Sequence, residues 1–116
     1  MTELTPEQIE EFWECYGFYR GEDITGTEVW KYPDRKERVL LPPIDLNSLF
    51  RWAVPKLMNQ DGYQLHLITE LGEPEYFCCK VHLEHDPEWM ECVADVEDND
   101  PALALFWALW QVKEAT

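Results

Sequence analysis

The amino-acid sequence predicts an α+β fold, an α-β-α layered sandwich whose antiparallel sheet contains a three-stranded meander. Three segments carry apolar residues at helical spacing, and a stretch between two of them carries three strand-forming runs separated by turns. Hydrophobic residues make up 46% of the 116 residues and aromatic residues 14%, which is enough apolar surface for a core. We expect the order α-ββ-α-βββ-α in a single domain over residues 1–116.

Residues 5–16 are predicted to form the first helix. Thr5 can cap its start, Pro6 suits its first turn and Gln8 completes a capping box. Its apolar residues form one stripe: Ile9, Phe12, Trp13 and Tyr16. We expect this amphipathic helix to cover one face of the sheet, and the other two helices to share the opposite face.

Residues 27–41 are predicted to form a β-hairpin. The expected strands are Thr27–Tyr32 and Glu37–Leu41, and Pro33-Asp34-Arg35-Lys36 between them has the composition of a type I turn. The two prolines that follow, Pro42 and Pro43, should end the hairpin.

Residues 45–59 are predicted to form the second helix, with Asp45 as its N-cap. Its expected buried stripe consists of Leu46, Leu49, Phe50, Ala53 and Leu57. Pro55 falls inside this pattern, and it lacks the amide hydrogen that a helix interior requires. It should therefore kink the helix near residues 51–54 or split it.

Residues 63–96 are predicted to form the meander, with strands Tyr63–Thr69, Tyr76–Leu83 and Met90–Val96. In the last strand, alternation predicts these inward side chains: Met90, Cys92, Ala94 and Val96. Residues 101–114, capped by Asp100, should form a final helix that is apolar nearly all round. Such a helix is expected to lie in the centre of the core or to face a partner as well.

The charge of the chain excludes several partners. Its formal net charge of −15 repels phosphate backbones and anionic lipids, so we expect neither direct nucleic-acid binding nor membrane binding. Residues 31–56 hold six of the nine Lys and Arg residues, whereas residues 84–100 hold eight acidic residues and no basic one. Either these are solvated surfaces, or they form an electrostatic recognition surface. The first residues lack the features of a signal peptide, which predicts a cytoplasmic protein.

No set of residues completes a catalytic, metal-binding or cofactor-binding motif, so we expect no cofactor and no enzymatic activity. Cys78, Cys79, His82 and His85 lie along one predicted strand, where alternation sends them to opposite faces and prevents tetrahedral zinc binding. His82, Glu84 and Asp86 share one strand face and could hold a hard cation, but no further ligands are apparent. Ser48, the only serine, occupies a helix-capping position. The four cysteines are expected to be reduced and mostly buried.

An interaction surface is the remaining candidate site. Three tryptophans fall outside the predicted core stripes, Trp30, Trp52 and Trp89, and tryptophan is enriched in binding hot spots. The acidic candidates in the same surface are Glu84, Asp86, Glu88, Glu97 and Asp98.

Several short motifs resemble those of the phage ABA sandwich domain family, small phage and prophage proteins of unknown function. These are Pro42-Pro43-Ile44-Asp45-Leu46 opening a helix with Phe50 and Lys56-Leu57, then Pro101, Ala104-Leu105 and Ala108-Leu109 after the meander. The resemblance implies a small phage-type protein with α-β-α layers and no assigned catalytic residues. We expect a non-enzymatic module that binds another protein or itself. The alternatives are a DNA mimic that inhibits a nucleic-acid-binding protein and a small metal-dependent hydrolase.

Overall fold

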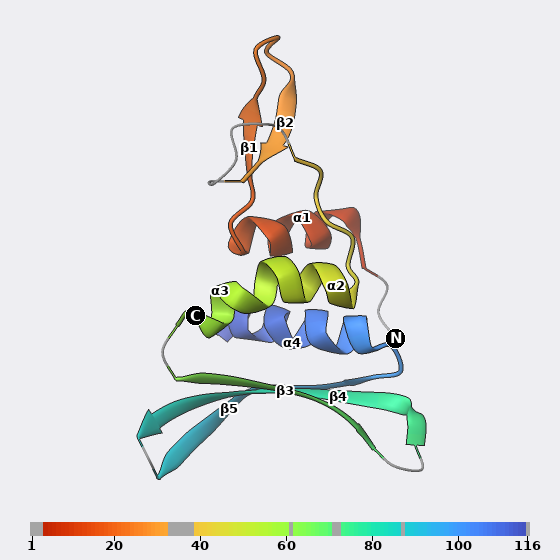
Figure 1. Cartoon of the computed structure of the whole chain (residues 1–116), viewed down its shortest axis with the longest axis vertical. Helices are drawn as coiled ribbons and strands as arrows, with labels where there is room; N and C mark the ends of the chain where they lie inside the picture. Colours follow the sequence, from red (N-terminus) through yellow and green to blue (C-terminus); the bar gives the residue numbers. More distant parts are fainter. Residues whose placement is uncertain (1–3, 33–38, 61, 71–72, 87, 116) are drawn as a thin grey trace. The chain divides into compact units, whose positions relative to one another are not determined.

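The computed structural model describes residues 4–32, 39–60, 62–70, 73–86 and 88–115. Its elements are α1 (Pro6–Cys15), β1 (Tyr19–Glu22), β2 (Glu28–Lys31), α2 (Leu46–Ser48), the π-helix η1 (Leu49–Ala53), α3 (Val54–Met58), β3 (Tyr63–Glu70), β4 (Glu73–Asp86), β5 (Trp89–Asp98) and α4 (Pro101–Ala115) (Figure 1). Because α2, η1 and α3 follow one another without a break, the predicted order α-ββ-α-βββ-α is confirmed. The chain forms two compact units, one up to Pro43 and one from Ile44 onward. The expectation of a single domain stays a prediction.

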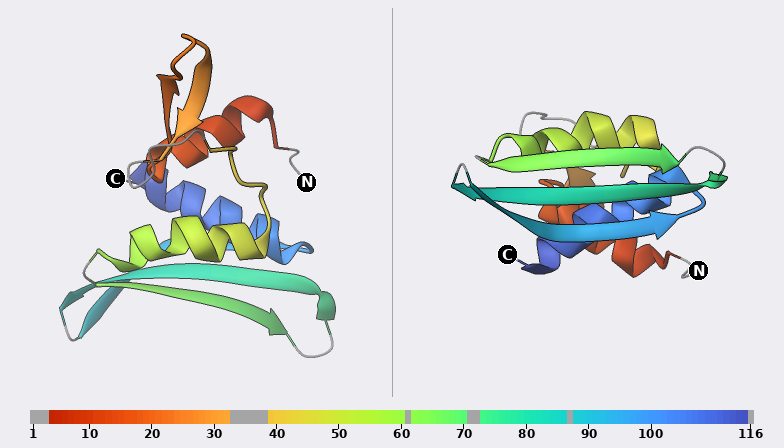
Figure 2. Two further views of the ribbon diagram at one scale, coloured as in Figure 1. Left: turned by 45° about the horizontal axis from the view of Figure 1, so that its top comes forward. Right: turned by 90° about the horizontal axis from the view of Figure 1, so that it is seen from below.

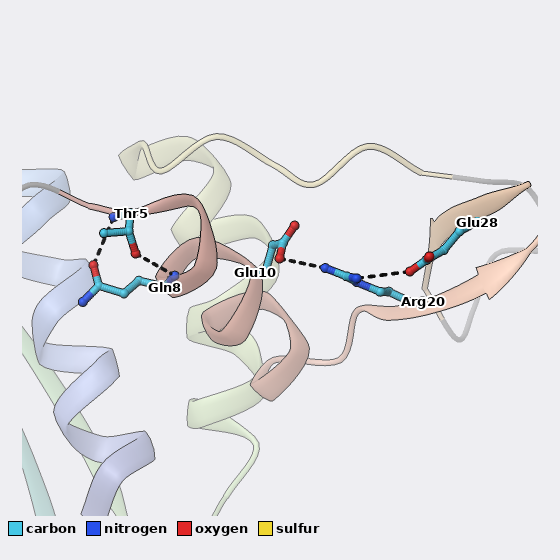
Figure 3. Close-up of polar contacts among 5 residues, drawn as sticks. All are labelled: Thr5, Gln8, Glu10, Arg20 and Glu28. Carbon is cyan, nitrogen blue, oxygen red and sulfur yellow. Dashed lines mark hydrogen bonds and ion pairs between the residues drawn. The ribbon is translucent and has the colours of Figure 1, made fainter.

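In the first unit, α1 begins as its sequence predicts. The Thr5 hydroxyl accepts a hydrogen bond from the Gln8 amide at 3.1 Å, and the Gln8 side chain accepts one from the Thr5 amide at 3.0 Å (Figure 3). The two bonds satisfy amide groups that have no partner within the helix. Phe12 and Trp13 of α1 are completely buried, and the Trp13 indole donates to the Pro42 carbonyl oxygen at 3.0 Å.

The hairpin of the first unit differs from the predicted one. β2 matches the predicted strand Thr27–Tyr32, but it pairs with β1, a strand that was not predicted. Of the expected partner strand 37–41, residues 39–41 are described, and the Val39 amide donates to the Trp30 carbonyl oxygen at 2.9 Å in an isolated bridge. The predicted turn at 33–36 lies outside the described residues. A turn at 23–27 joins β1 to β2 instead.

In the second unit, the second helix is continuous but changes from α to π geometry before Pro55, where the sequence predicts a kink or a split. The Asp45 carboxylate accepts a hydrogen bond from the Ser48 amide at 2.7 Å and so caps α2. The backbone then widens into η1, where the Val54 amide donates to the Leu49 carbonyl oxygen, five residues earlier. Pro55 lies in the first turn of α3, directly after η1, where it supplies no amide donor to the preceding turn.

The π-helical segment also changes which side chains face the core. A π turn holds more residues than an α turn, so the α-helical stripe predicted from the sequence loses its phase across η1. Leu49, Ala53 and Leu57 are buried as expected, and Val54 joins them. Phe50 is exposed, so the prediction that it lies in the buried stripe is wrong.

The predicted meander is an antiparallel sheet in the order β3-β4-β5. α4 contacts β4 and β5, and α3 contacts β3, so the helices of this unit share one face of the sheet (Figure 2). Cys79, Val81 and Ala94 are buried on that face. The expectation that the first helix covers the other face involves both units and stays a prediction.

A β-bulge reverses the side chains at the start of β5. Val81 pairs with Ala94, but the next residue of β4, His82, pairs with Cys92, so Val93 is an extra residue. Ala94 and Val96 point toward the helices as predicted, whereas the residues before the bulge change face. Met90 and Cys92 are exposed, so the prediction that they point inward is wrong.

The final helix, α4, is a core element. The Asp100 carboxylate caps it by accepting a hydrogen bond from the Ala102 amide at 2.8 Å. Its buried residues are Ala102, Ala104, Leu105, Phe106, Ala108, Leu109 and Val112. Trp107 and Trp110 are half-buried. Among the described residues, no helix is long and apolar enough to cross a membrane.

Candidate interaction face

One face of the β3-β4-β5 sheet is turned away from α3 and α4, and we call it the outer face (Figure 2). Strand register and the bulge in β5 determine its members. They are Gln64, His66 and Ile68 from β3, then Cys78, Lys80, His82 and Glu84 from β4, then Met90, Cys92, Asp95 and Glu97 from β5. All of these side chains are exposed or half-buried.

The middle of the outer face is polar. The rings of His66 and His82 meet edge to face, with centroids 5.5 Å apart. Lys80 lies between His66 on β3 and Asp95 on β5. The Cys78 thiol donates to the Asp95 carboxylate at 3.5 Å, and burial, together with Asp95, raises the pKa of Cys78.

Carboxylates outnumber cations on this face. Lys80 is the only Lys or Arg between residues 57 and 112, whereas Glu84, Asp95 and Glu97 carry negative charge on β4 and β5.

The free edge of the sheet along β5 is partly covered. The Asp95 amide, on this edge, donates to the Gln111 side chain of α4 at 3.3 Å. A side chain from α4 therefore covers part of this strand edge.

Trp89 lies where β4 and β5 are joined, and its side chain is 55% exposed. The His85 ring stacks on the indole with centroids 4.1 Å apart and planes 21° apart. The Nε2 atom of His85 lies 2.8 Å from a carboxylate oxygen of Glu91. The indole is thus exposed to solvent on one side and supported by an anchored imidazole on the other.

The other two candidate tryptophans are half-buried. In the first unit the Arg20 guanidinium lies 5.0 Å from the Trp30 ring centroid. In the second unit the Arg51 guanidinium lies at the same distance from Trp52 on η1. Each ring therefore already has a cationic neighbour within its own unit. Of the three candidates, Trp89 is the one with a largely exposed ring.

The acidic candidates occupy different places. Glu84 and Glu97 lie on the outer face, and Glu88 is exposed beside Trp89. The backbone of Asp86 pairs with that of Trp89. Asp98 points toward the helix side, and its carboxylate accepts a hydrogen bond from the Asp100 amide at 2.9 Å. Asp98 therefore supports the start of α4 rather than the outer face.

Sequence reasoning missed several members of the outer face, notably His66, Lys80 and Asp95. They belong to three strands, and only the pairing of β3 with β4 and of β4 with β5 places them in one row. Met90 and Cys92 were missed because the bulge reverses them. The glycine-free sequence around Val93 contains no signal for that bulge.

The residues considered for chemistry are separated. Cys78 and His82 lie on the outer face and Cys79 is buried on the other, as alternation predicts. Among the described residues, no three His, Cys, Asp or Glu side chains are arranged to hold a metal ion. The amide of Ser48, a buried residue, donates to its capping partner Asp45.

None of the four cysteines, all of them described, forms a disulfide, and their surroundings differ. Burial raises the pKa of Cys79 to about 12, so this thiol stays protonated at neutral pH and is a poor nucleophile. Cys15 and Cys92 are exposed and Cys78 is half-buried. The prediction of mostly buried thiols is therefore wrong, because neither the end of α1 nor the bulged part of β5 turns its cysteine toward a core.

No family model, curated protein or solved structure matches the chain. The resemblance to the phage ABA sandwich domain family stays a prediction.

Proposed function

We propose that the chain is a non-enzymatic protein-interaction module that binds a basic partner protein at the β4-β5 end of the sheet, through Trp89 and the carboxylates of the adjoining outer face. The observation that carries the proposal is the exposed Trp89 ring, held by His85 at the end of a sheet whose outer face carries more carboxylates than Lys and Arg residues. A cytoplasmic location, in the host cell if the chain is phage-encoded, belongs to the same proposal. The reduced state of the four cysteines supports it, since thiols persist in reducing compartments.

Trp89 has the properties of an interface anchor. A tryptophan side chain buries a large apolar area and can donate a hydrogen bond from its indole nitrogen. Stacking on His85 restricts the ring before any partner arrives. Less conformational freedom is then lost on binding, which favours affinity.

The charges around Trp89 define the expected partner. Glu84, Glu88 and Glu91 lie near the junction of β4 and β5, and residues 84–100 contain no Lys or Arg. A partner surface carrying Lys and Arg around an apolar pocket would complement both the indole and the carboxylates. Such complementarity accelerates association and makes it sensitive to salt.

Imitation of nucleic acid by the acidic surface is the competing function. A mimic binds through carboxylates that replace phosphates, so its affinity would fall steeply with salt and would not need an exposed indole. Lys80, in the centre of the outer face, interrupts a continuous negative array there. We therefore prefer binding anchored by Trp89.

The test is affinity for a partner captured from the source cells by the full-length chain and then purified. We expect Trp89→Ala to weaken binding by roughly thirtyfold, the effect of losing a hot-spot residue. Trp30→Ala, which removes a tryptophan elsewhere, should leave the affinity unchanged. Both variants should be checked for folding by thermal unfolding before affinities are compared.

Charge is tested with a matched pair of double variants. Glu84→Lys with Glu97→Lys reverses two charges on the outer face. Glu7→Lys with Glu14→Lys makes the same change in net charge at exposed positions of α1. Only the first should weaken binding by more than tenfold. Two results together would instead support mimicry: binding is abolished at about 0.5 M salt, and Trp89→Ala leaves the affinity unchanged. At that salt concentration the Debye length is roughly 4 Å, so interactions between exposed charges are screened.

A further inference from the structure

The loop between β1 and β2 presents an apolar side chain to solvent. Ile24 has a relative exposure of 103%, the highest of the large apolar side chains that are exposed in the described residues. A single exposed apolar residue on a surface is ordinary. Ile24 differs because the loop that carries it, residues 23–27, is fixed by its own hydrogen bonds. We call this loop the hairpin tip.

One carboxylate oxygen organises the hairpin tip. Oδ1 of Asp23 accepts hydrogen bonds from the Thr25 amide at 2.9 Å, the Thr25 hydroxyl at 2.6 Å and the Thr27 amide at 3.0 Å. The Gly26 amide donates to the Asp23 carbonyl oxygen at 3.0 Å, which closes a β-turn around Ile24 and Thr25. Gly26 has a φ of 82°, as expected of the third residue in a three-residue hairpin loop.

The turn does not itself require an isoleucine. Asp at the first position and Gly at the fourth favour this turn, whereas the second position, held by Ile24, accepts most residues. A polar residue there would be compatible with the same backbone and better solvated. The fold therefore explains Asp23 and Gly26 but not the apolar side chain between them.

The charges beside Ile24 are negative. Residues 22–28 contain Glu22, Asp23 and Glu28 and no Lys or Arg. Glu22 and Glu28 are directly opposite in the register of β1 and β2, an arrangement that is unfavourable in isolation. Arg20 relieves part of it through an ion pair with Glu28 at 3.2 Å. Anionic lipid surfaces would be repelled by this loop, whereas a basic protein surface would be attracted.

We propose that the hairpin tip is a docking element that inserts Ile24 into an apolar socket on a partner protein, with Lys or Arg side chains around the socket facing Glu22 and Glu28. Because the loop is already ordered, docking requires little additional loss of conformational freedom. This contact uses only residues of the first unit. It is independent of the binding proposed for the outer face.

The test is photo-crosslinking of the full-length chain in lysate of the source cells, with benzoylphenylalanine replacing Ile24. A matched control carries the same probe at Leu40, which is 88% exposed in the same unit. We expect a discrete protein adduct only from position 24, and the crosslinked partner peptide should hold an apolar residue near Lys or Arg. Equal adducts from both positions, or none from position 24, would overturn the proposal.

Substitutions then measure the contribution of the side chain to binding of the crosslinked partner. Ile24→Asp should weaken binding by about tenfold or more, Ile24→Val should nearly preserve it, and Leu40→Asp should have no effect. Neither exposed position contributes to a core, so thermal unfolding of these variants should match the parent chain. Binding of the parent chain to phosphatidylcholine vesicles that is lost in Ile24→Asp would also overturn the proposal, because it would identify a membrane contact.

Discussion

His85 stacks on Trp89 with ring centroids 4.1 Å apart, so a histidine from β4 orders the exposed indole at the start of β5. The same imidazole contacts Glu91, which lies on β5 as well. The proposed anchor is thus held by side chains of both strands, and its order depends on His85.

Removing the His85 ring should release Trp89. In His85→Ala we expect the order parameter of the Trp89 side-chain Nε1 to fall below about 0.6, the range of flexible groups, as measured by ¹⁵N relaxation. His85→Phe keeps a stacking ring but loses the contact with Glu91, so it should stay close to the parent value. An unchanged order parameter in His85→Ala would show that the stack does not restrain the indole.

Arg20 should stabilise the first unit through three contacts. Its guanidinium pairs with Glu10 at 2.7 Å and with Glu28 at 3.2 Å (Figure 3). It also lies 5.0 Å from the ring centroid of Trp30. These groups are partly exposed, so we expect Arg20→Ala to lower the free energy of unfolding by only about 1 kcal/mol. Urea unfolding measures the effect, which should shrink at high salt.

The matched variant for this test is Arg20→Lys. Lysine keeps the charge but lacks the planar guanidinium that can bind both carboxylates at once. The free energy of unfolding of Arg20→Lys should therefore lie between those of the parent protein and Arg20→Ala. Equal stability of all three proteins would mean that the network does not contribute to folding.

Gly26 should be sensitive to substitution for conformational reasons alone. A Cβ atom at this position meets nothing within 4 Å, but the φ of 82° is unfavourable for a residue with a side chain. Gly26→Ala should therefore destabilise the hairpin by about 1 kcal/mol, and faster hydrogen exchange of the Thr27 amide should report it. Gly26→Asn should be milder, because asparagine tolerates this region. Similar exchange rates in the two variants would contradict this explanation.

Cys79 should make stability depend on pH in alkaline solution. Burial raises its pKa from 9.0 to about 12, so between pH 9 and 12 the unfolded chain releases a proton that the folded chain keeps. The stabilising contribution is present below pH 9 and is lost as pH rises toward 12, at about 1.4 kcal/mol per pH unit. In Cys79→Ala, the free energy of unfolding measured by urea titration should fall less steeply with pH over this range, by that amount.

Cys78 should react slowly with iodoacetamide, because burial and Asp95 raise its pKa and so disfavour the reactive thiolate. We expect Asp95→Asn to accelerate the alkylation of Cys78 several-fold, measured by peptide mass spectrometry. Glu97→Gln should have a smaller effect, since Glu97 is the weaker of the two acidic contributions. A larger effect of Glu97→Gln would contradict the contact between Cys78 and Asp95.

Local signals predicted much of the fold. The caps at Thr5, Asp45 and Asp100 were read correctly because each depends on residues two or three positions away. An irregularity of the helix just before Pro55 was also predicted, since proline removes a backbone donor wherever it stands. The missed turn at 23–27 had a readable signal as well, with Asp and Gly at the two ends of its β-turn.

The candidate site was only partly predictable. Trp89, Glu84 and Glu97 were identified by residue type, but their surroundings were not. Phe50 and Met90 were both predicted to lie in the core because regular helical and strand periods were assumed. The π turn displaces the helical period around Phe50 by part of a turn. The β-bulge displaces the strand period before Val93, and so at Met90, by one residue.

The sequence by itself determined the element order, the helix starts and the acidic character of residues 84–100, because these follow from neighbours along the chain. Only the tertiary structure decided that His66, Lys80 and Asp95 share one row, that His85 supports Trp89, and that Ile24 stands exposed on a fixed turn. Those relationships depend on strand register and burial. Both are set by packing between distant segments, so no local pattern records them.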